Sequence, residues 1–277
     1  MTAPGIHDGL DEATYHADKA SLSVSGAKKL LPPSCPAKFF HDREHGQAPK
    51  AEFDFGHAAH SAVLGAGPVM RIVDAEDWRT KAAREQRDEI RAAGEVPVLR
   101  AEAEQVAGMA SAIKAHPIAS ALLDRDHGKP EQSGYWHDAD HDVLRRFRLD
   151  WLPETNGGRL IVSDYKTAIS AEPGAIRKAV ANYGYYMQHA WYVDGLHALE
   201  VAEDIAFVFI FQEKTAPYLV TVAELDAEAI LLGRKRNDQA LQVYAECTAT
   251  NTWPPYSSEV ELISLPAWAT YQLQESA

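Results

Sequence analysis

The chain has 277 residues, of which 46% are hydrophobic, so it is long enough to bury a substantial core. Its 27 lysines and arginines against 40 aspartates and glutamates give a formal net charge of −13. This charge repels a polyanion at long range and argues against nucleic-acid binding without a local basic track and divalent metal. The two cysteines, Cys35 and Cys247, have no Cys-x-x-Cys partner, which argues against a disulfide framework and a thiolate zinc site.

The chain shows neither a basic-then-apolar leader nor an apolar run of membrane-spanning length. We therefore expect a soluble, cytoplasmic protein with no membrane partner. The pattern favours a single domain over 1–277. It divides into a mainly helical part over 1–125, a catalytic sheet with helices over 126–225, and a C-terminal helix and tail over 226–277.

The first half of the chain carries several helical patterns. Ser21–Ser25 predicts a serine cap for a short helix ending at Leu31, where Pro32 and Pro33 stop it. Further helices are predicted over 37–40, 53–64, 77–93 and 101–115, followed by a short turn over 118–123. The spacing puts His57 and His60 on adjacent turns of the second of these helices.

After Pro130 the sequence changes to short strands separated by turns. A meander of three strands is predicted over 131–136, 143–151 and 159–165. Helices follow over 172–182 and 186–199, strands over 205–212 and 218–222, and an amphipathic helix from 224 to about 247. These elements predict an α/β fold with a central mixed sheet from about 131 to 222, flanked by helices and by the helical N-terminal half.

Two neighbouring strands carry the residues that point to chemistry. Asp150 ends one predicted strand, and Asp164 and Lys166 end the next. The ends of an ideal hairpin point opposite ways, so Asp150 and Asp164 are expected to meet only if a strand bends or bulges. The two carboxylates would bind Mg²⁺ with the carbonyl between Asp164 and Lys166, and Lys166 would orient or activate the attacking water. Phosphodiester hydrolysis suits this set, although Asp-x-Lys alone is common by chance.

The basic residues are clustered, which could provide a local track for DNA. The clusters are Lys28-Lys29, Arg145-Arg146-Phe147-Arg148, Arg177-Lys178 and Arg234-Lys235-Arg236. Taken one at a time, each cluster is more typical of a solvated surface.

Several motifs in this order resemble the PD-(D/E)xK nucleases, specifically the RecE-like, exonuclease VIII type of phages and prophages. The motifs are YHADKASLSVSGAKKLLPPSCPAKFF, FDFGHAAHSAVL, EQSGYW, RRFRLDWL, LIVSDYKTA and YGYYMQHAWYVDGL. The resemblance covers about Tyr15 to Leu199. Leu149 stands where the family name has proline, a common variation.

The resemblance implies a role for each matching residue. Asp150 and Asp164 match the metal-binding carboxylates and Lys166 the catalytic lysine. His60 matches an additional metal ligand of related RecB-type nucleases, and Glu131 an upstream acid that binds metal directly or through water. Read without the resemblance, His60 is more typical of a buried or rim histidine and Glu131 is as well explained as an exposed acid.

The resemblance also implies contacts with DNA. Gln188 and Tyr185 match a Tyr-x-x-Gln element that reaches the substrate strand or the scissile phosphate, although the surrounding aromatic residues also suit a core helix. We assign Arg146 and Arg148 of the basic cluster to DNA binding as well. The implied activity is a Mg²⁺- or Mn²⁺-dependent exodeoxyribonuclease acting on ends of linear duplex DNA, with a single-strand annealing protein as partner and a homo-oligomeric state.

Three alternatives stay open at this point. The same fold could carry an endonuclease or repair nickase, because a fold does not determine the reaction. A catalytically inactive DNA-binding scaffold is disfavoured by the joint presence of Asp150, Asp164 and Lys166. A metal hydrolase for a small phosphorylated substrate would suit the acidic net charge.

Overall fold

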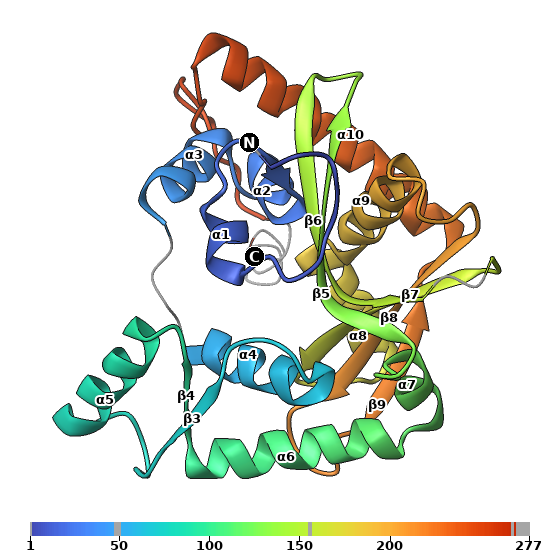
Figure 1. Cartoon of the computed structure of the whole chain (residues 1–277). Helices are drawn as coiled ribbons and strands as arrows, with labels where there is room; N and C mark the ends of the chain where they lie inside the picture. Colours follow the sequence, from blue (N-terminus) through green and yellow to red (C-terminus); the bar gives the residue numbers. More distant parts are fainter. Residues whose placement is uncertain (1, 47–50, 155–156, 267–268, 270–277) are drawn as a thin grey trace, which may run out of the picture.

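The computed structural model describes residues 2–46, 51–154, 157–266 and 269. Within these ranges the main element is a seven-stranded mixed sheet in the order β1-β5-β6-β7-β8-β9, with β2 paired to β6 (Figure 1). The strands are β1 Gly5–His7, β2 Leu22–Ser23, β5 Gly128–Asp138, β6 Val143–Pro153, β7 Leu160–Ala168, β8 Ile205–Glu213 and β9 Val220–Glu224. β5, β6 and β7 are antiparallel neighbours, whereas β7 and β8 run parallel. The predicted central mixed sheet is thus confirmed.

Helices cover both faces of this sheet. In Figure 1, α9 and α10 lie above β7 and β8, and α4 and α6 lie below them. Side chains alternate along β8, so Phe209 joins the core cluster with α9 and α10, whereas Ile210 joins the cluster with α4 and α6. The helices are α1 Glu12–Ala17, α2 Val24–Leu30, α3 Pro36–His45, α4 Ala51–Leu64, α5 Lys81–Ala92, α6 Arg100–Ala115, α7 Pro117–Leu122, α8 Pro173–Tyr183, α9 Tyr185–Ala198 and α10 Ala227–Thr250.

The N-terminal half contains more strand than the sequence predicts. β1 and β2 join the main sheet, and β3 (Met70–Val73) pairs in parallel with β4 (Val96–Leu99) in a second small sheet. These strands have two to four residues, too few for a period to stand out, and Pro97 interrupts the pattern of β4. α1 and the helical form of α7 were also not predicted, whereas the serine cap was correct, because Ser23 Oγ accepts a bond from Gly26 N at 3.3 Å.

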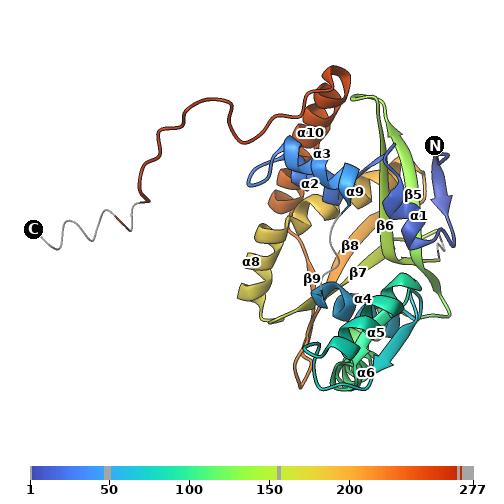
Figure 2. The same cartoon turned by 90° about the vertical axis from the view of Figure 1, so that its left-hand side faces the viewer.

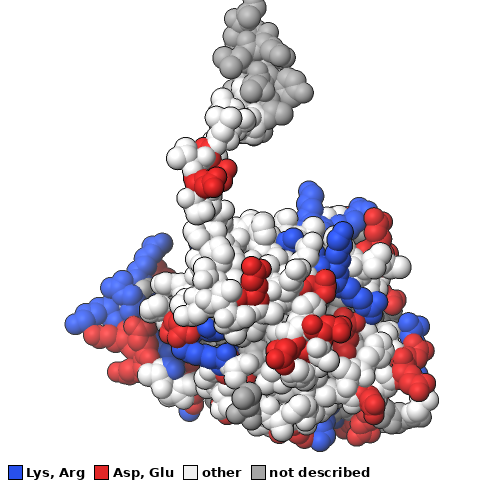
Figure 3. Space-filling view, turned by 90° about the horizontal axis from the view of Figure 1, so that it is seen from above, with Lys and Arg blue, Asp and Glu red and all other residues white. Residues whose placement is uncertain are grey.

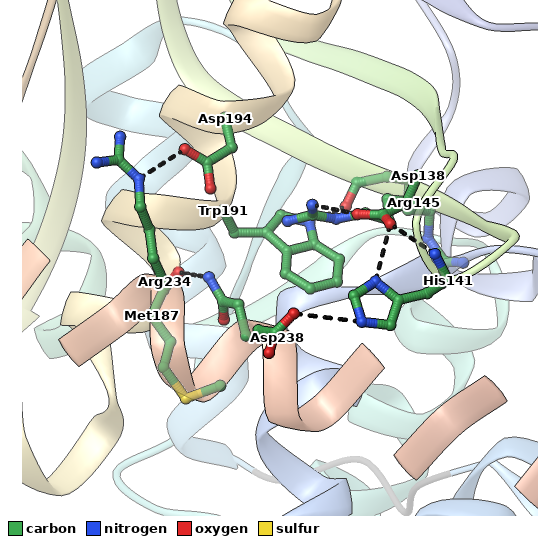
Figure 4. Close-up of polar contacts among 10 residues, drawn as sticks. Asp138, His141, Arg145, Met187, Trp191, Asp194, Arg234 and Asp238 are labelled. Atoms are coloured by element: carbon green, nitrogen blue, oxygen red, sulfur yellow. Dashed lines mark hydrogen bonds and ion pairs between the residues drawn. The ribbon is translucent and has the colours of Figure 1, made fainter. Parts of the chain in front are cut away.

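Arg145 anchors the turn end of the β5–β6 hairpin to the helices (Figure 4). Its guanidinium carbon lies 3.9 Å from the ring centroid of Trp191, and Nη1 donates to Asp138 at 2.9 Å. His141 Nδ1 lies 2.9 Å from Asp138, and His141 Nε2 lies 3.2 Å from Asp238 on α10. We call these four charged or titratable residues, Asp138, His141, Arg145 and Asp238, the Arg145 network. This arginine of the 145–148 cluster is therefore a packing residue rather than part of a solvated surface.

The chain after α10 first runs back along α3, where Trp253 stacks on Phe40 and Ala37 N donates to Pro254 O at 3.0 Å. Beyond this contact the described segment extends away from the helices in Figure 2, and Val260, Leu262 and Ile263 are exposed along it. Among the helices in the described ranges, none is both long and apolar enough to span a membrane.

Candidate active site

Asp150 and Asp164 lie side by side across β6 and β7. The register pairs Trp151 with Ser163, so the next residue on each strand is one of the two aspartates. Both strands run further than predicted, and the aspartates are therefore not at opposite strand ends and need no bend of β6 or β7 to meet. Beyond the pair of Trp151 and Ser163, the described residues of β6 and β7 form no further pair, and the two strands separate. The backbone amide of Tyr165 donates instead to the carboxylate of Asp150, at 2.7 Å from Oδ2.

Glu131 extends this pair to a row of three acids on three neighbouring strands. β5 pairs with β6 on both sides of it, at Pro130 and Gln132, and the register puts Asp150 opposite Glu131. Glu131 has φ of 54°, a left-handed conformation that is unusual for a glutamate. The bend predicted for one of the strands carrying Asp150 and Asp164 is therefore not needed, and the unusual backbone conformation lies in β5 instead. We call Glu131, Asp150 and Asp164 the acid row.

His60 approaches the acid row from α4. Its Nδ1 lies 3.6 Å from Asp150 Oδ2, and His60, Glu131 and Asp150 each offer one ligand atom within 4.8 Å of the others. Like charges directly opposite each other destabilise a sheet, whereas two carboxylates and an imidazole are suitable donors for a divalent cation such as Mg²⁺ or Mn²⁺. The donor set therefore fits a divalent metal centred on these three residues.

Asp164, which the sequence predicts as a metal-binding carboxylate, lies beside this group of three and not within it. Two side chains hold it there. Lys166, two residues along β7 and so on the same face, contacts its Oδ2 through Nζ. Gln188 Nε2, from the buried face of α9, donates to Asp164 Oδ1 at 2.7 Å. Gln188 thus contacts a carboxylate of the site, where the sequence predicts a contact with DNA.

Burial changes the protonation of these groups. Burial raises the pKa of Asp150 to about 6, and burial together with the charge of Asp150 raises that of Asp164 to about 6. Burial lowers the pKa of His60 to about 4, with a contribution from Lys166, so its imidazole is neutral at pH 7 and able to bind metal. Burial disfavours the charged form of Lys166, but Asp164 and Asp150 outweigh it and raise its pKa, so it remains a cation.

The two arginines assigned to DNA binding are both engaged by the protein. Arg148 Nε lies 2.5 Å from Glu131 Oε2, so this side chain neutralises and orients one member of the acid row. Arg146 is 7% exposed and donates to Ser21 Oγ at 2.7 Å and to Asp18 O at 2.9 Å. These bonds attach β6 to the N-terminal segment, so nothing in the geometry supports a contact of Arg146 with DNA.

An open cleft of about 810 Å³ leads to the site. Among the residues that line it are His60, Glu131, Arg148, Lys166 and Tyr185. Tyr185 therefore lies where a substrate strand could reach it, and its ring centroid is 5.3 Å from Lys166 Nζ.

Three further residues near the site were not identified from the sequence. Glu12 and His57 also line the cleft, with 3.6 Å between Glu12 Oε1 and His57 Nε2. Lys28 of α2 lies over the ring of Tyr185, with its Nζ 5.6 Å from the centroid. The spacing of His57 and His60 on one helix hinted at the first contact. The Lys28-Lys29 pair is one of the basic clusters in the sequence, but no local pattern places Lys28 beside Tyr185.

The surface charge is mixed where it can be seen from above the molecule. In Figure 3, acidic and basic side chains alternate over this face, and neither sign forms a continuous track across it. The positive charge nearest the acid row comes from buried or half-buried side chains, Lys28, Arg148 and Lys166. Attraction of a polyanion would therefore be local to the cleft.

Comparisons with known proteins agree with this geometry. The family model described as "PDDEXK-like domain of unknown function (DUF3799)" matches residues 23–266. A crystal structure described as "Putative exonuclease" from Eubacterium rectale superposes with a TM-score of 0.63 at 12% identity, covering 95% of this chain and 98% of that one. This likeness concerns the fold alone.

Two other comparisons add nothing to the argument. The structure of SSO0001 superposes with a TM-score of 0.37 at 13% identity, covering 86% of this chain and 79% of that one. No curated protein matches the sequence. The family match spans most of the chain and includes Asp150, Asp164 and Lys166, and the chain therefore belongs to the family of PDDEXK-like domains.

Proposed function

We propose that this protein is a divalent-metal-dependent exodeoxyribonuclease that hydrolyses phosphodiester bonds from an end of linear duplex DNA. The observation that carries the proposal is the acid row, because three carboxylates from adjacent strands face one another beside a neutral histidine and a charged lysine. Structural charges are seldom arranged in this way, since like charges repel more strongly in a buried setting.

Each residue of the site has a distinct part in the proposed reaction. His60, Glu131 and Asp150 would hold the metal, which supplies positive charge at the scissile phosphate and makes a water molecule more acidic. Lys166, kept charged by its carboxylate neighbours, orients the attacking water or a phosphate oxygen.

The supporting contacts keep the acid row in position. Arg148 fixes Glu131, the Tyr165 amide fixes Asp150, and Gln188 fixes Asp164. These bonds come from β5, β6, β7 and α9, which belong to the rigid sheet and its covering helix.

The finer parts of the proposal rest on the resemblance to RecE-like enzymes. It supports digestion from an end, a place in phage-type recombination, a single-strand annealing protein as partner and a homo-oligomeric state. The family match supports the coarser statement of a PD-(D/E)xK nuclease with DNA as its substrate.

The test of the proposal measures digestion of one duplex in two matched forms, linear and covalently closed circular. Each form is incubated with the protein and Mg²⁺, Mn²⁺, Ca²⁺ or excess chelator. We expect digestion of the linear form with Mg²⁺ or Mn²⁺ and none with Ca²⁺ alone or chelator, because Ca²⁺ holds its ligands in a looser geometry. Cleavage of the closed circle would identify an endonuclease instead, and activity in chelator would contradict the metal requirement. Labelling each end separately gives the polarity.

A further inference from the structure

Two adjacent lysines of α2 have different surroundings. Lys29 Nζ lies 2.7 Å from Asp42 Oδ2 in a half-exposed ion pair. Lys28 extends to the other side, where its Nζ lies 5.6 Å from the centroid of Tyr185. Lys166 Nζ lies 5.3 Å from the same centroid, so two lysines share one aromatic ring at the edge of the acid row.

Lys28 is a half-buried lysine with no anionic partner among the described residues. Within the described ranges, no carboxylate forms an ion pair with Lys28 and no acceptor is within hydrogen-bonding distance of it. Burial lowers the pKa of Lys28 to about 7, the charge of Lys166 lowers it further, and Asp164 acts in the opposite direction. An anion bound beside Lys28 and the ring of Tyr185 would raise this pKa again and keep the lysine charged, so the position is suited to receive a negatively charged group from outside the chain.

The start of α9 adds a second feature that favours an anion. Gly184 precedes this 14-residue helix and has no side chain to accept a bond from its first amides. The first amides of α9 therefore have no side-chain acceptor from the cap residue, and the C-terminal end of α8, which Gly184 also caps, lies directly before them. A Cβ at Gly184 would lie 3.3 Å from Lys28 Cε, so the glycine leaves the space that the lysine stem occupies.

We propose that Lys28 binds a phosphate group of the DNA strand beside Tyr185 and so acts as a substrate-binding residue next to the catalytic lysine. Tyr185 lines the cleft that leads to the acid row, and a strand entering this cleft would bring phosphates to the ring that both lysines share. This role presupposes the proposed function. It explains how a chain with a net charge of −13 holds a polyanion at this point.

The test compares full-length Lys28→Met with wild type and with Lys29→Met as a matched control. Methionine keeps the apolar stem that packs beside Gly184 and removes the charge. Binding of labelled duplex is measured in Ca²⁺ over a series of salt concentrations. We expect Lys28→Met to bind on the order of tenfold more weakly. The slope of log binding constant against log salt concentration should be smaller in magnitude by about 0.7–0.9, as loss of one phosphate contact predicts. Lys29→Met should keep the wild-type slope, and Lys28→Arg should restore it.

The phosphate bound by Lys28 could be the terminal phosphate of the strand or an internal backbone phosphate. Duplexes that end in a phosphate or in a hydroxyl distinguish these two sources. A loss confined to phosphate-ended DNA identifies a terminal phosphate, and an equal loss with both identifies an internal backbone phosphate. Wild-type affinity and slope in folded Lys28→Met would overturn the inference. If that variant does not fold, Lys28→Gln gives the same test. Failure of the wild type to bind or cleave DNA would instead refute the proposed function.

Discussion

The β5–β6 hairpin carries buried charges at both of its ends, and it balances them differently. At the turn end, Arg145 stacks on Trp191 and faces Asp138, which also contacts His141. At the other end, Glu131 and Asp150 lie opposite each other with Asp164 beside them. The Arg145 network alternates opposite charges, whereas the acid row puts like charges side by side.

This difference distinguishes a structural cluster from a candidate functional one. A buried pair of opposite charges fixes the geometry of a fold when both partners are present, and it leaves no demand for an external ion. In the acid row, Arg148 and Lys166 each pair with one outer carboxylate, whereas Asp150 between them has no lysine or arginine partner among the described residues. Its charge is therefore balanced better when a cation binds beside it. Substitutions at the first end should therefore lower stability, and substitutions at the second should lower activity.

The largest effect is expected from Asp164→Asn and Lys166→Ala. Each should reduce cleavage of linear duplex by at least about 10²–10³-fold. Lys166→Ala removes positive charge that would stabilise the developing negative charge, and Asp164→Asn removes the carboxylate that holds Lys166 beside the proposed metal-binding residues. Neither creates a core cavity, so circular dichroism should show a wild-type fold for both variants. Lys166→Ala should also lower the urea midpoint, because the buried Asp164 loses its ion-pair partner. Wild-type cleavage by either folded variant would exclude this site.

At the other end of the hairpin, Arg145→Ala should lower the free energy of unfolding by about 3–5 kcal/mol. The buried guanidinium and its packing on Trp191 are lost, and Asp138 keeps only His141 as a partner among the described residues. Urea denaturation measures this loss. The folded fraction should retain wild-type cleavage. Asp238→Asn is the control within the same network, since this side chain is largely exposed and should change stability by less than about 1 kcal/mol. A loss from Arg145→Ala no larger than the control's would contradict a structural role.

A smaller effect is expected for His60→Ala, which tests whether α4 contributes a ligand to the acid row. Loss of a residue that only contacts a metal ligand lowers metal affinity by roughly 10–100-fold. Loss of the ligand His60 itself should lower metal affinity by at least this much. High Mn²⁺ should restore part of the cleavage by mass action. Metal titrations of cleavage give both values. Loss of thermal stability with an unchanged metal dependence would remove His60 from the site.

Gln188→Ala should have the smallest effect, because Gln188 holds Asp164 and is a positioning residue. Loss of one bond to a charged group corresponds to about 1.5–3 kcal/mol, or roughly 10–100-fold in turnover. The metal concentration for half-maximal cleavage should stay at the wild-type value, since Gln188 offers no ligand. A large shift in that concentration would assign it to the metal site.

Local patterns predicted much of the sheet and its helices. β5 to β8 and α8 to α10 follow from period-two and helical spacings, and Asp164 and Lys166 share a face because strand side chains alternate. The Pro173 start and the Ser23 cap are also local signals. These features depend on contacts within a few residues.

The remaining features depend on long-range pairing. The acid row requires the registers of three strands, and a one-residue shift would turn Glu131 or Asp150 away from the site. The sequence assigns Arg146 to DNA binding because nothing near it in sequence shows that it is buried. Its partner Ser21 is 125 residues away in sequence. Lys28 meets Lys166 through the packing of α2 against α9, which no local pattern specifies.

Calorimetric titration of Mn²⁺ at pH 7.5 into wild type and Asp150→Asn tests most directly whether the acid row is a metal centre. Asp150 lies in the middle of the row and contacts His60, so its charge should govern the site. We expect saturable binding to wild type and its loss in the folded variant, with Arg145→Lys binding like wild type. Equal binding by wild type and Asp150→Asn, or no binding by wild type, would contradict the account.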